Sequence, residues 1–117
     1  MKHTRESIVA IICECRKNGT GIVLRGADLS GLDLRGLDLR DADLRDADLR
    51  RTDLRWANLQ CADLRGADLR WADLRWTDLR WANLRGSDLR GADLDFAGYE
   101  LSCKTIGIKA DKRLVSQ

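Results

Sequence analysis

A five-residue period sets the hydrophobic and polar positions over most of the chain. Read from Gly21, the blocks begin GIVLR, GADLS, GLDLR, GLDLR and DADLR, and they end GSDLR, GADLD and FAGYE. Leu holds the fourth place from Leu24 to Leu94, and Asp or Asn holds the third place from Asp28 to Asp93. The second place is apolar or small, and is mostly Ala. The chain therefore repeats one structural unit every five residues.

Neither a helix nor a flat strand can bury this pattern. A helix advances about 100° per residue, so a five-residue period would wind the leucines round every side of the cylinder. In a flat strand, an odd period would place successive leucines on opposite faces. Within one block, however, the second and fourth residues share a face, as Ala42 and Leu44 do in a short strand. We expect a chain that turns a corner after every block, with the Ala/Leu pairs inward and the Asp and corner residues outward.

The tandem A-[DN]-L-x-x motif resembles the signature of the pentapeptide-repeat family. The resemblance covers residues 21–100, which hold sixteen consecutive blocks. Members of this family form a right-handed quadrilateral β-helix in which four blocks make one square coil of twenty residues. The resemblance thus implies an all-β solenoid, a right-handed quadrilateral β-helix of about four coils. The first coil and residues 4–17 add to this fold an N-terminal α-helical cap, for the reasons that follow.

The first coil predicts a cap at the N-terminal end. Its second places include Ile22, Leu32 and Leu37, where later blocks have Ala, Thr or Ser. The core should therefore be widest at this end, and a solenoid end exposes core and strand edges unless something covers them. Residues 4–17 supply a cover of the right kind, because their apolar side chains recur at helical spacing.

One amphipathic helix is expected over this segment. Thr4 or Ser7 can accept amide hydrogen bonds at its start, and Asn18 and Gly19 provide its stop. The apolar face of this helix would consist of Ile8, Ile11, Ile12 and Cys15. The predicted domains are an N-terminal helical cap over residues 1–20, the β-helix over 21–100, and a C-terminal cap or tail of unpredicted conformation over 101–117.

Charge and segment composition narrow the classes of partner. Within residues 21–100, thirteen Arg stand against sixteen acidic residues, and the whole chain has a formal charge of +2. Such a balance gives no strong field toward nucleic acid or an anionic membrane. No segment is apolar enough to span a bilayer, and no secretory leader pattern is present. We therefore expect a cytoplasmic protein with reduced cysteines and neither a nucleic-acid nor a membrane partner.

Aromatic residues at the first places of blocks form the candidate interaction surface. If one coil takes twenty residues, Trp56, Trp76 and Phe96 lie above one another, whereas Trp71 and Trp81 lie on two other corners. A cluster of exposed aromatic side chains is typical of a contact patch, including one for self-association. The other interpretation is that the rings only stack along the rod and cover neighbouring Arg side chains.

The third-place carboxylates and fifth-place guanidinium groups suggest an ion-pair lattice. An Arg two residues after each Asp can lie beside it and reach carboxylates on neighbouring coils. The lattice could be a solvated structural face, or it could contact a charged partner. The family resemblance also implies a DNA-mimic alternative, since some members, including quinolone-resistance proteins, bind DNA gyrase with a strongly acidic rod. Here the Arg residues should cancel most of such a field.

Residues for catalysis or metal binding are scarce. The single histidine is His3, so no Ser-His-Asp or Cys-His arrangement is expected from ordered parts. Cys13 and Cys15 would point to different sides of a helix, and Cys61 and Cys103 offer no second close pair for zinc. The sequence predicts no catalytic residue, cofactor or metal site.

The function predicted from these observations is a non-catalytic scaffold or protein-binding module. Its partner would be an unidentified protein, or a second copy that docks through a cap or the aromatic column. Two alternatives stay open: a DNA mimic that binds DNA gyrase or topoisomerase, and a structural repeat with no dedicated partner.

Overall fold

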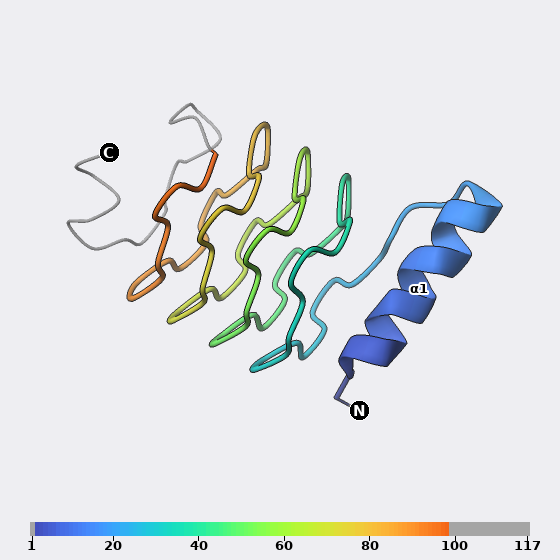
Figure 1. Cartoon of the computed structure of the whole chain (residues 1–117), viewed down its shortest axis with the longest axis horizontal. Coiled ribbons are helices and arrows are strands. Elements are labelled where there is room, and N and C mark those ends of the chain that lie inside the picture. The colour runs from blue at the N-terminus through green and yellow to red at the C-terminus, as the bar shows by residue number, and fades with distance from the viewer. Residues whose placement is uncertain (1, 99–117) are drawn as a thin grey trace.

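The computed structural model describes residues 2–98 and consists of one helix followed by a stack of square coils (Figure 1). The helix is α1, Arg5–Asn18, and it lies across one end of the stack. The C-terminal cap expected over 101–117 lies outside the described residues. No helix among residues 2–98 is long and apolar enough to cross a membrane.

Helix α1 begins and ends at the residues that the sequence predicts. The Thr4 side chain accepts a hydrogen bond from the Ser7 amide at 3.1 Å, and the Ser7 hydroxyl accepts one from the Thr4 amide at 2.9 Å. This reciprocal pair satisfies two amides that would otherwise lack partners at the helix start. At the other end, Gly19 adopts a left-handed conformation with φ 68°, which glycine tolerates best.

Successive coils pair through residues twenty apart. Parallel β-bridges run from Val23 to Asp43, from Asp43 to Asp63 and onward to the pair of Asp78 with Gly98. Each bridge involves only the third place of a block, and residues 2–98 contain no longer strand. The short strands expected within blocks are thus reduced to single bridges, because the chain turns before a second residue can pair. The interval of twenty residues confirms that four blocks make one coil.

A tight turn at every corner explains the odd period. The amide of each second-place residue donates to the carbonyl of the Leu three residues earlier, as Ala47 does to Leu44 at 3.1 Å. The first-place residue in the middle of the turn has a positive φ, 69° at Gly26 and 65° at Trp56. A turn with a positive φ only at its third residue is a type II turn, for which glycine is preferred.

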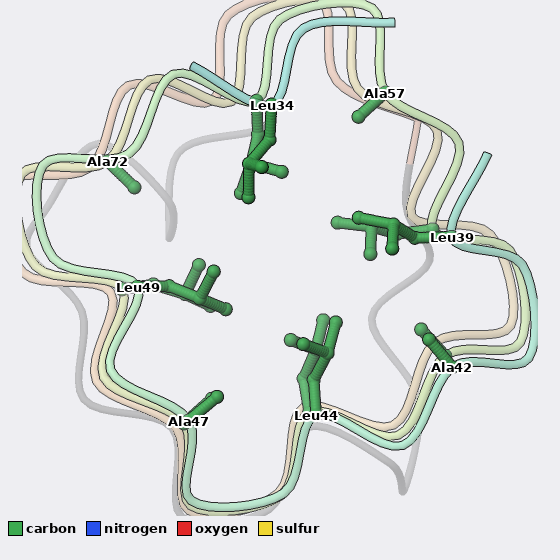
Figure 2. Close-up of a cluster of buried hydrophobic side chains, with 14 of the residues drawn as sticks. Leu34, Leu39, Ala42, Leu44, Ala47, Leu49, Ala57 and Ala72 are labelled. Carbon is green, nitrogen blue, oxygen red and sulfur yellow. The ribbon is translucent and has the colours of Figure 1, made fainter. Parts of the chain in front are cut away.

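Leucine and small residues fill the interior of the coils. Figure 2 shows Leu34, Leu39, Leu44 and Leu49 pointing inward from four sides, with Ala side chains beside them. The fourth-place leucines are all buried, and so are Thr52, Thr77 and Ser87 at second places. Each of these three hydroxyls donates to a Leu carbonyl at 2.7 Å, which offsets the cost of burying it.

Helix α1 closes the wide end of this core. Ile8 and Ile12 are buried against the first coil, and Ile11 and Cys15 pack at the edge of the same cluster. The apolar helical face predicted from the sequence is therefore confirmed. Leu32 and Leu37, the large second-place residues that indicated the need for a cover, pack against the same core cluster.

Candidate interaction surface

Three aromatic rings form a stack along one corner of the coils. This aromatic ladder consists of Trp56, Trp76 and Phe96. The ring centroids of Trp56 and Trp76 are 5.1 Å apart with an interplanar angle of 1°, and those of Trp76 and Phe96 are 4.4 Å apart at 11°. The side chains remain 64%, 47% and 68% exposed along the ladder. The column predicted from the spacing of twenty residues is thus both stacked and open to solvent.

The ladder residues occupy strained backbone. Trp56, Trp76 and Phe96 have φ values of 65°, 62° and 62°. A left-handed conformation costs a residue with a side chain about 1–2 kcal/mol relative to one in the right-handed region. Ring stacking returns about 0.5–1.5 kcal/mol for each pair. Backbone preference alone would favour glycine here, and ring stacking offsets part of this strain.

The other two tryptophans stand apart from the ladder. Trp71 and Trp81 are 62% and 61% exposed, and neither has a ring partner within residues 2–98. Trp71 lies over Gly91, where an added Cβ would come within 2.5 Å of the indole Cε3. Trp81 occupies the corner of Cys61, an exposed free thiol. The structure therefore places the five candidate residues on three corners and brings only the ladder residues together.

The third-place Asp has a second role that the repeat pattern did not suggest to us. In the block of Asp43, the Oδ1 atom accepts the backbone amide of Arg45 at 3.2 Å. Asn58 accepts the Gln60 amide in the same way at 3.0 Å. A side-chain oxygen that bonds the amide two residues on is typical of Asx turns. The alternation of Asp with Asn at this place was the available signal, because only the side-chain oxygen is common to both.

The Asp and Arg side chains also form the expected lattice. Within a block, the Arg45 Nε and Nη2 atoms donate to the two Asp43 oxygens at 2.8 and 2.7 Å. Between coils, Arg45 Nε lies 3.7 Å from Asp63 Oδ2. The short fork joins residues of one block, and the longer ion pair joins successive coils. This geometry confirms the predicted lattice, in which the contacts within a block are shorter than those between coils.

The lattice keeps the aspartates ionised. The hydrogen bond from Arg45 is the main reason that the pKa of Asp43 falls to about 2, with desolvation opposing it. Arg90 lowers the pKa of Asp88 to about 2 in the same way. In return, these aspartates raise the pKa values of their arginines. A carboxylate held ionised by its neighbour is a poor general acid near neutral pH.

Groups suited to metal binding do not converge in the described part of the chain. Residues 2–98 contain no cluster of three or more His, Cys, Asp or Glu side chains that could hold a metal ion. The Nδ1 atom of His3 lies 3.3 Å from the Ser7 hydroxyl, beside the helix cap. Cys13, Cys15 and Cys61 are free thiols, and Cys103 lies outside the described residues.

Comparison with known proteins identifies the repeat. The sequence profile described as "Pentapeptide repeats" matches in 8 copies, over residues 18–46, 38–75 and 72–97. No curated protein matches the chain by sequence.

Several solved structures are similar to the chain. A pentapeptide repeat protein from the cyanobacterium Cyanothece 51142 is 35% identical, with a TM-score of 0.40, and the match covers 77% of this chain and 60% of that one. One from Nostoc PCC 7120 is 31% identical, with a TM-score of 0.35 and coverage of 88% and 95%. QnrB1, a plasmid-mediated fluoroquinolone resistance protein, is 19% identical, with a TM-score of 0.46 and coverage of 83% and 62%. This chain therefore spans less than two thirds of the Cyanothece and QnrB1 chains.

Proposed function

Since this chain belongs to the pentapeptide-repeat family, we propose that it is a right-handed quadrilateral β-helix that serves as a non-catalytic, protein-binding scaffold. The observation that carries the proposal is the aromatic ladder of Trp56, Trp76 and Phe96, stacked yet largely exposed. The partner is an unidentified protein with an apolar surface that covers the ring edges.

The energetics of the ladder support a binding role. Stacking buries the ring faces against one another but leaves about half or more of each side chain in water. A partner that covers these edges would bury further apolar area, worth roughly 25 cal/mol per Å². Aromatic anchors of this kind commonly supply about 2 kcal/mol or more of binding energy at interfaces.

The charge lattice gives less support to a DNA mimic. Such a mimic needs a field like that of a duplex, with about one negative charge per 1.7 Å of axis. Here Asp43, Asp63 and Asp73 each lie within 2.7 Å of an Arg Nη2 atom on their own block. Paired charges of opposite sign cancel at a distance, so the rod presents a mixed surface. We expect no inhibition of DNA gyrase in a supercoiling assay.

The test compares two sets of substitutions at equivalent corners. The ladder variant carries Trp56→Asn, Trp76→Asn and Phe96→Asn, because Asn tolerates the left-handed conformation. Its matched control carries Trp71→Asn and Trp81→Asn on the other corners. The wild type and both variants are used as baits in a cross-linked pull-down, and the protein recovered with the wild type is then titrated against each of the three purified chains. We expect the ladder variant to lose at least tenfold in affinity and the control to lose less than twofold.

Self-association is measured alongside this titration. If sedimentation velocity shows a dimer that the ladder variant dissociates, the partner is a second copy of the chain. Equal binding of one purified partner by the wild type and the ladder variant would refute the ladder as the interface.

A further inference from the structure

A second surface feature lies on a different corner from the ladder. A groove of about 430 Å³ runs along the corner that carries Gly31, Arg51 and Trp71 in successive coils. The volume falls at the lower end of the range of about 300–1,000 Å³ that is usual for small-molecule sites. The ladder side chains do not line it, so its function is separate from the proposed protein interface.

The groove results from a local departure from the repeat. Most blocks end in Arg, but the block of Asp28 ends in Ser30, and glycine follows at position 31. The Ser30 hydroxyl and amide donate to Asp28 Oδ1 at 2.7 and 3.1 Å, in place of the guanidinium fork. A small hydroxyl and a missing side chain leave room where an Arg would lie. Lys2 borders this space, with Nζ 3.3 Å from the Ser30 hydroxyl.

The groove is lined by positive charge. Lys2, Arg50, Arg51 and Arg70 border it, and none of the described residues that line it is acidic. Arg50 and Arg70 bind Asp48 and Asp68 through Nε and Nη2, which leaves the Nη1 side of each guanidinium outside the fork.

Arg51 differs from these paired arginines. It stands at a first place with φ 58°, exposed, and takes part in no ion pair among residues 2–98. The charge of Arg51 is therefore available to an anion, and Lys2, which also lies near the Asp28 carboxylate, adds a second positive charge at the groove. Two neighbouring cations favour a compact ligand with more than one negative charge.

Trp71 provides a planar surface beside these charges. Its ring covers Gly91 on the next coil, and the side chain is nevertheless 62% exposed and borders the groove. Gly91 allows the ring to lie close, because any Cβ there would meet it. An indole face next to a cationic cluster is suited to stacking a nucleobase while the cations bind its phosphate.

We propose that this groove binds a nucleoside monophosphate. The base stacks on Trp71, and the phosphate accepts hydrogen bonds from Arg51 and Lys2, with Arg50 and Arg70 adding positive potential. The groove volume of about 430 Å³ is sufficient for one nucleotide. A carboxylate peptide fits less well, because it would use neither the ring face nor the second charge.

The test uses the full chain and defined probes. Adenosine monophosphate, adenosine and inorganic phosphate are titrated by calorimetry, and the tryptophan indole N–H signals are followed by NMR. We expect adenosine monophosphate to bind at least fivefold more tightly than either of its parts and to shift the Trp71 signal selectively. Raising the salt concentration should weaken binding, because the charges are exposed.

Three variants separate the contributions. Arg51→Asn and Trp71→Asn keep a residue that tolerates positive φ, and each should weaken binding at least fivefold. Lys2→Gln lies outside the coils, so it tests the charge without risk to the core, and it should weaken binding at least twofold. Trp81→Asn is the matched control for Trp71→Asn and should change the affinity less than twofold.

Three results would overturn the proposal. The first is equal affinity for phosphate and adenosine monophosphate, which would leave only an anion site. The second is undiminished binding by Lys2→Gln together with Arg51→Asn. The third is tenfold tighter binding of a thymidine oligonucleotide than of adenosine monophosphate, since that would indicate a strand-binding face.

Discussion

The first coil and the three coils that follow it solve the same geometric problem with different residues. The first places of the first coil are all glycine: Gly21, Gly26, Gly31 and Gly36. Later first places are mostly larger residues held at positive φ, such as Asp41 and Trp56. The second places differ in the opposite sense, because three of the four in the first coil are large and apolar, whereas the later coils have Ala, Thr or Ser there. An end coil must therefore fill space above it, whereas an inner coil must leave space for its neighbours.

The contrast extends to the backbone. Between the first coil and the second, the carbonyls of Asp53 and Arg55 accept the amides of Leu34 and Gly36 from the coil before, at 2.8 and 3.0 Å. The first coil has no coil before it. There the Arg5 guanidinium on α1 donates to the carbonyls of Asp33 and Arg35, at 2.9 and 3.2 Å.

A second arginine repeats this arrangement on the next side of the coil. Arg16 donates to the carbonyls of Asp38 and Arg40, at 3.5 and 3.2 Å. One guanidinium thus takes the place of two backbone amides, and α1 acts as a substitute coil for both the core and the hydrogen bonds. A solenoid end needs both kinds of cover.

Acid should have the largest effect, because it acts on both regions at once. Native Asp38, Asp43, Asp78 and Asp88 have pKa values near 2, against about 3.9 for an unfolded Asp. Their contribution to stability is complete above about pH 4.5 and is lost as the pH falls from there through 2, since the unfolded chain takes up protons before the native one does. The Tm followed by circular dichroism should stay flat from pH 7 to about 4.5 and then fall steeply. A Tm that rises on acidification would contradict this account.

Truncation of core residues would show whether the end of the solenoid and its interior respond differently to the loss of a buried side chain. Ile8→Ala in α1 and Leu59→Ala in an inner coil each remove a fully buried side chain and should each cost about 2–5 kcal/mol of unfolding free energy. By hydrogen exchange, we expect Ile8→Ala to increase exchange chiefly in the first coil, because solenoid units contact only their neighbours. Leu59→Ala should increase it in the coils on both sides. Val9→Ala, at a partly exposed site on the same helix, is the control; uniform exchange in all variants would remove the distinction between regions.

Glycine substitutions would measure the corners of the two regions. Gly36→Ala meets no atom within 4 Å and should cost only the left-handed strain, about 1–2 kcal/mol. Gly91→Ala carries the same strain and also places Cβ against the Trp71 ring, so it should cost about 1–3 kcal/mol more. Gly21→Ala, which lacks positive φ and has open space, is the control. Urea unfolding followed by circular dichroism tests this order, and equal costs for Gly36→Ala and Gly91→Ala would rule out the ring contact.

Changes at third places should have the smallest effect. Asp73→Asn keeps an oxygen for the Arg75 amide and loses the fork, which should cost about 0–1 kcal/mol because the pair is partly exposed. Asp73→Ala loses both and should cost about 1 kcal/mol more. In the first coil, Asp28→Asn should cost less than Asp73→Asn, since Asp28 has a Ser as its fifth-place partner. Urea unfolding of the three variants gives the differences, and a larger loss for Asp28→Asn would show that Lys2 matters more than the fork.

Periodicity carried most of the fold and part of the site. Leu at the fourth place of each five-residue block predicts the core. The interval of twenty residues predicts the stacking of Trp56 on Trp76, because every coil has the same length. Thr4 and Gly19 predict the ends of α1 from local chemistry alone. The structural features that depend on the repeat or on residues close in sequence could therefore be predicted from the sequence.

Contacts between flexible side chains that lie far apart in the sequence could not be predicted. Nothing in the pattern places Arg5 and Arg16 on the carbonyls of the first coil, since that requires the angle at which α1 crosses it. The groove beside Ser30 needs the rotamers of Lys2 and Trp71 as well as their corner. The left-handed corners had a signal that we did not use, because glycine recurs at first places among residues that otherwise share no property.

Because all corners have the same turn, the number of blocks between two surface residues decides which of the four sides each residue occupies. Every block ends in the same turn, so removing five residues leaves the leucines inside but rotates all later surface residues by one side of the square. Without residues 66–70, Trp76 would move to the corner of Arg51, and Trp81 would move to the corner of Trp56 and extend the ladder from there. Surface columns can thus be realigned against one another in steps of one block, while the interior stays unchanged.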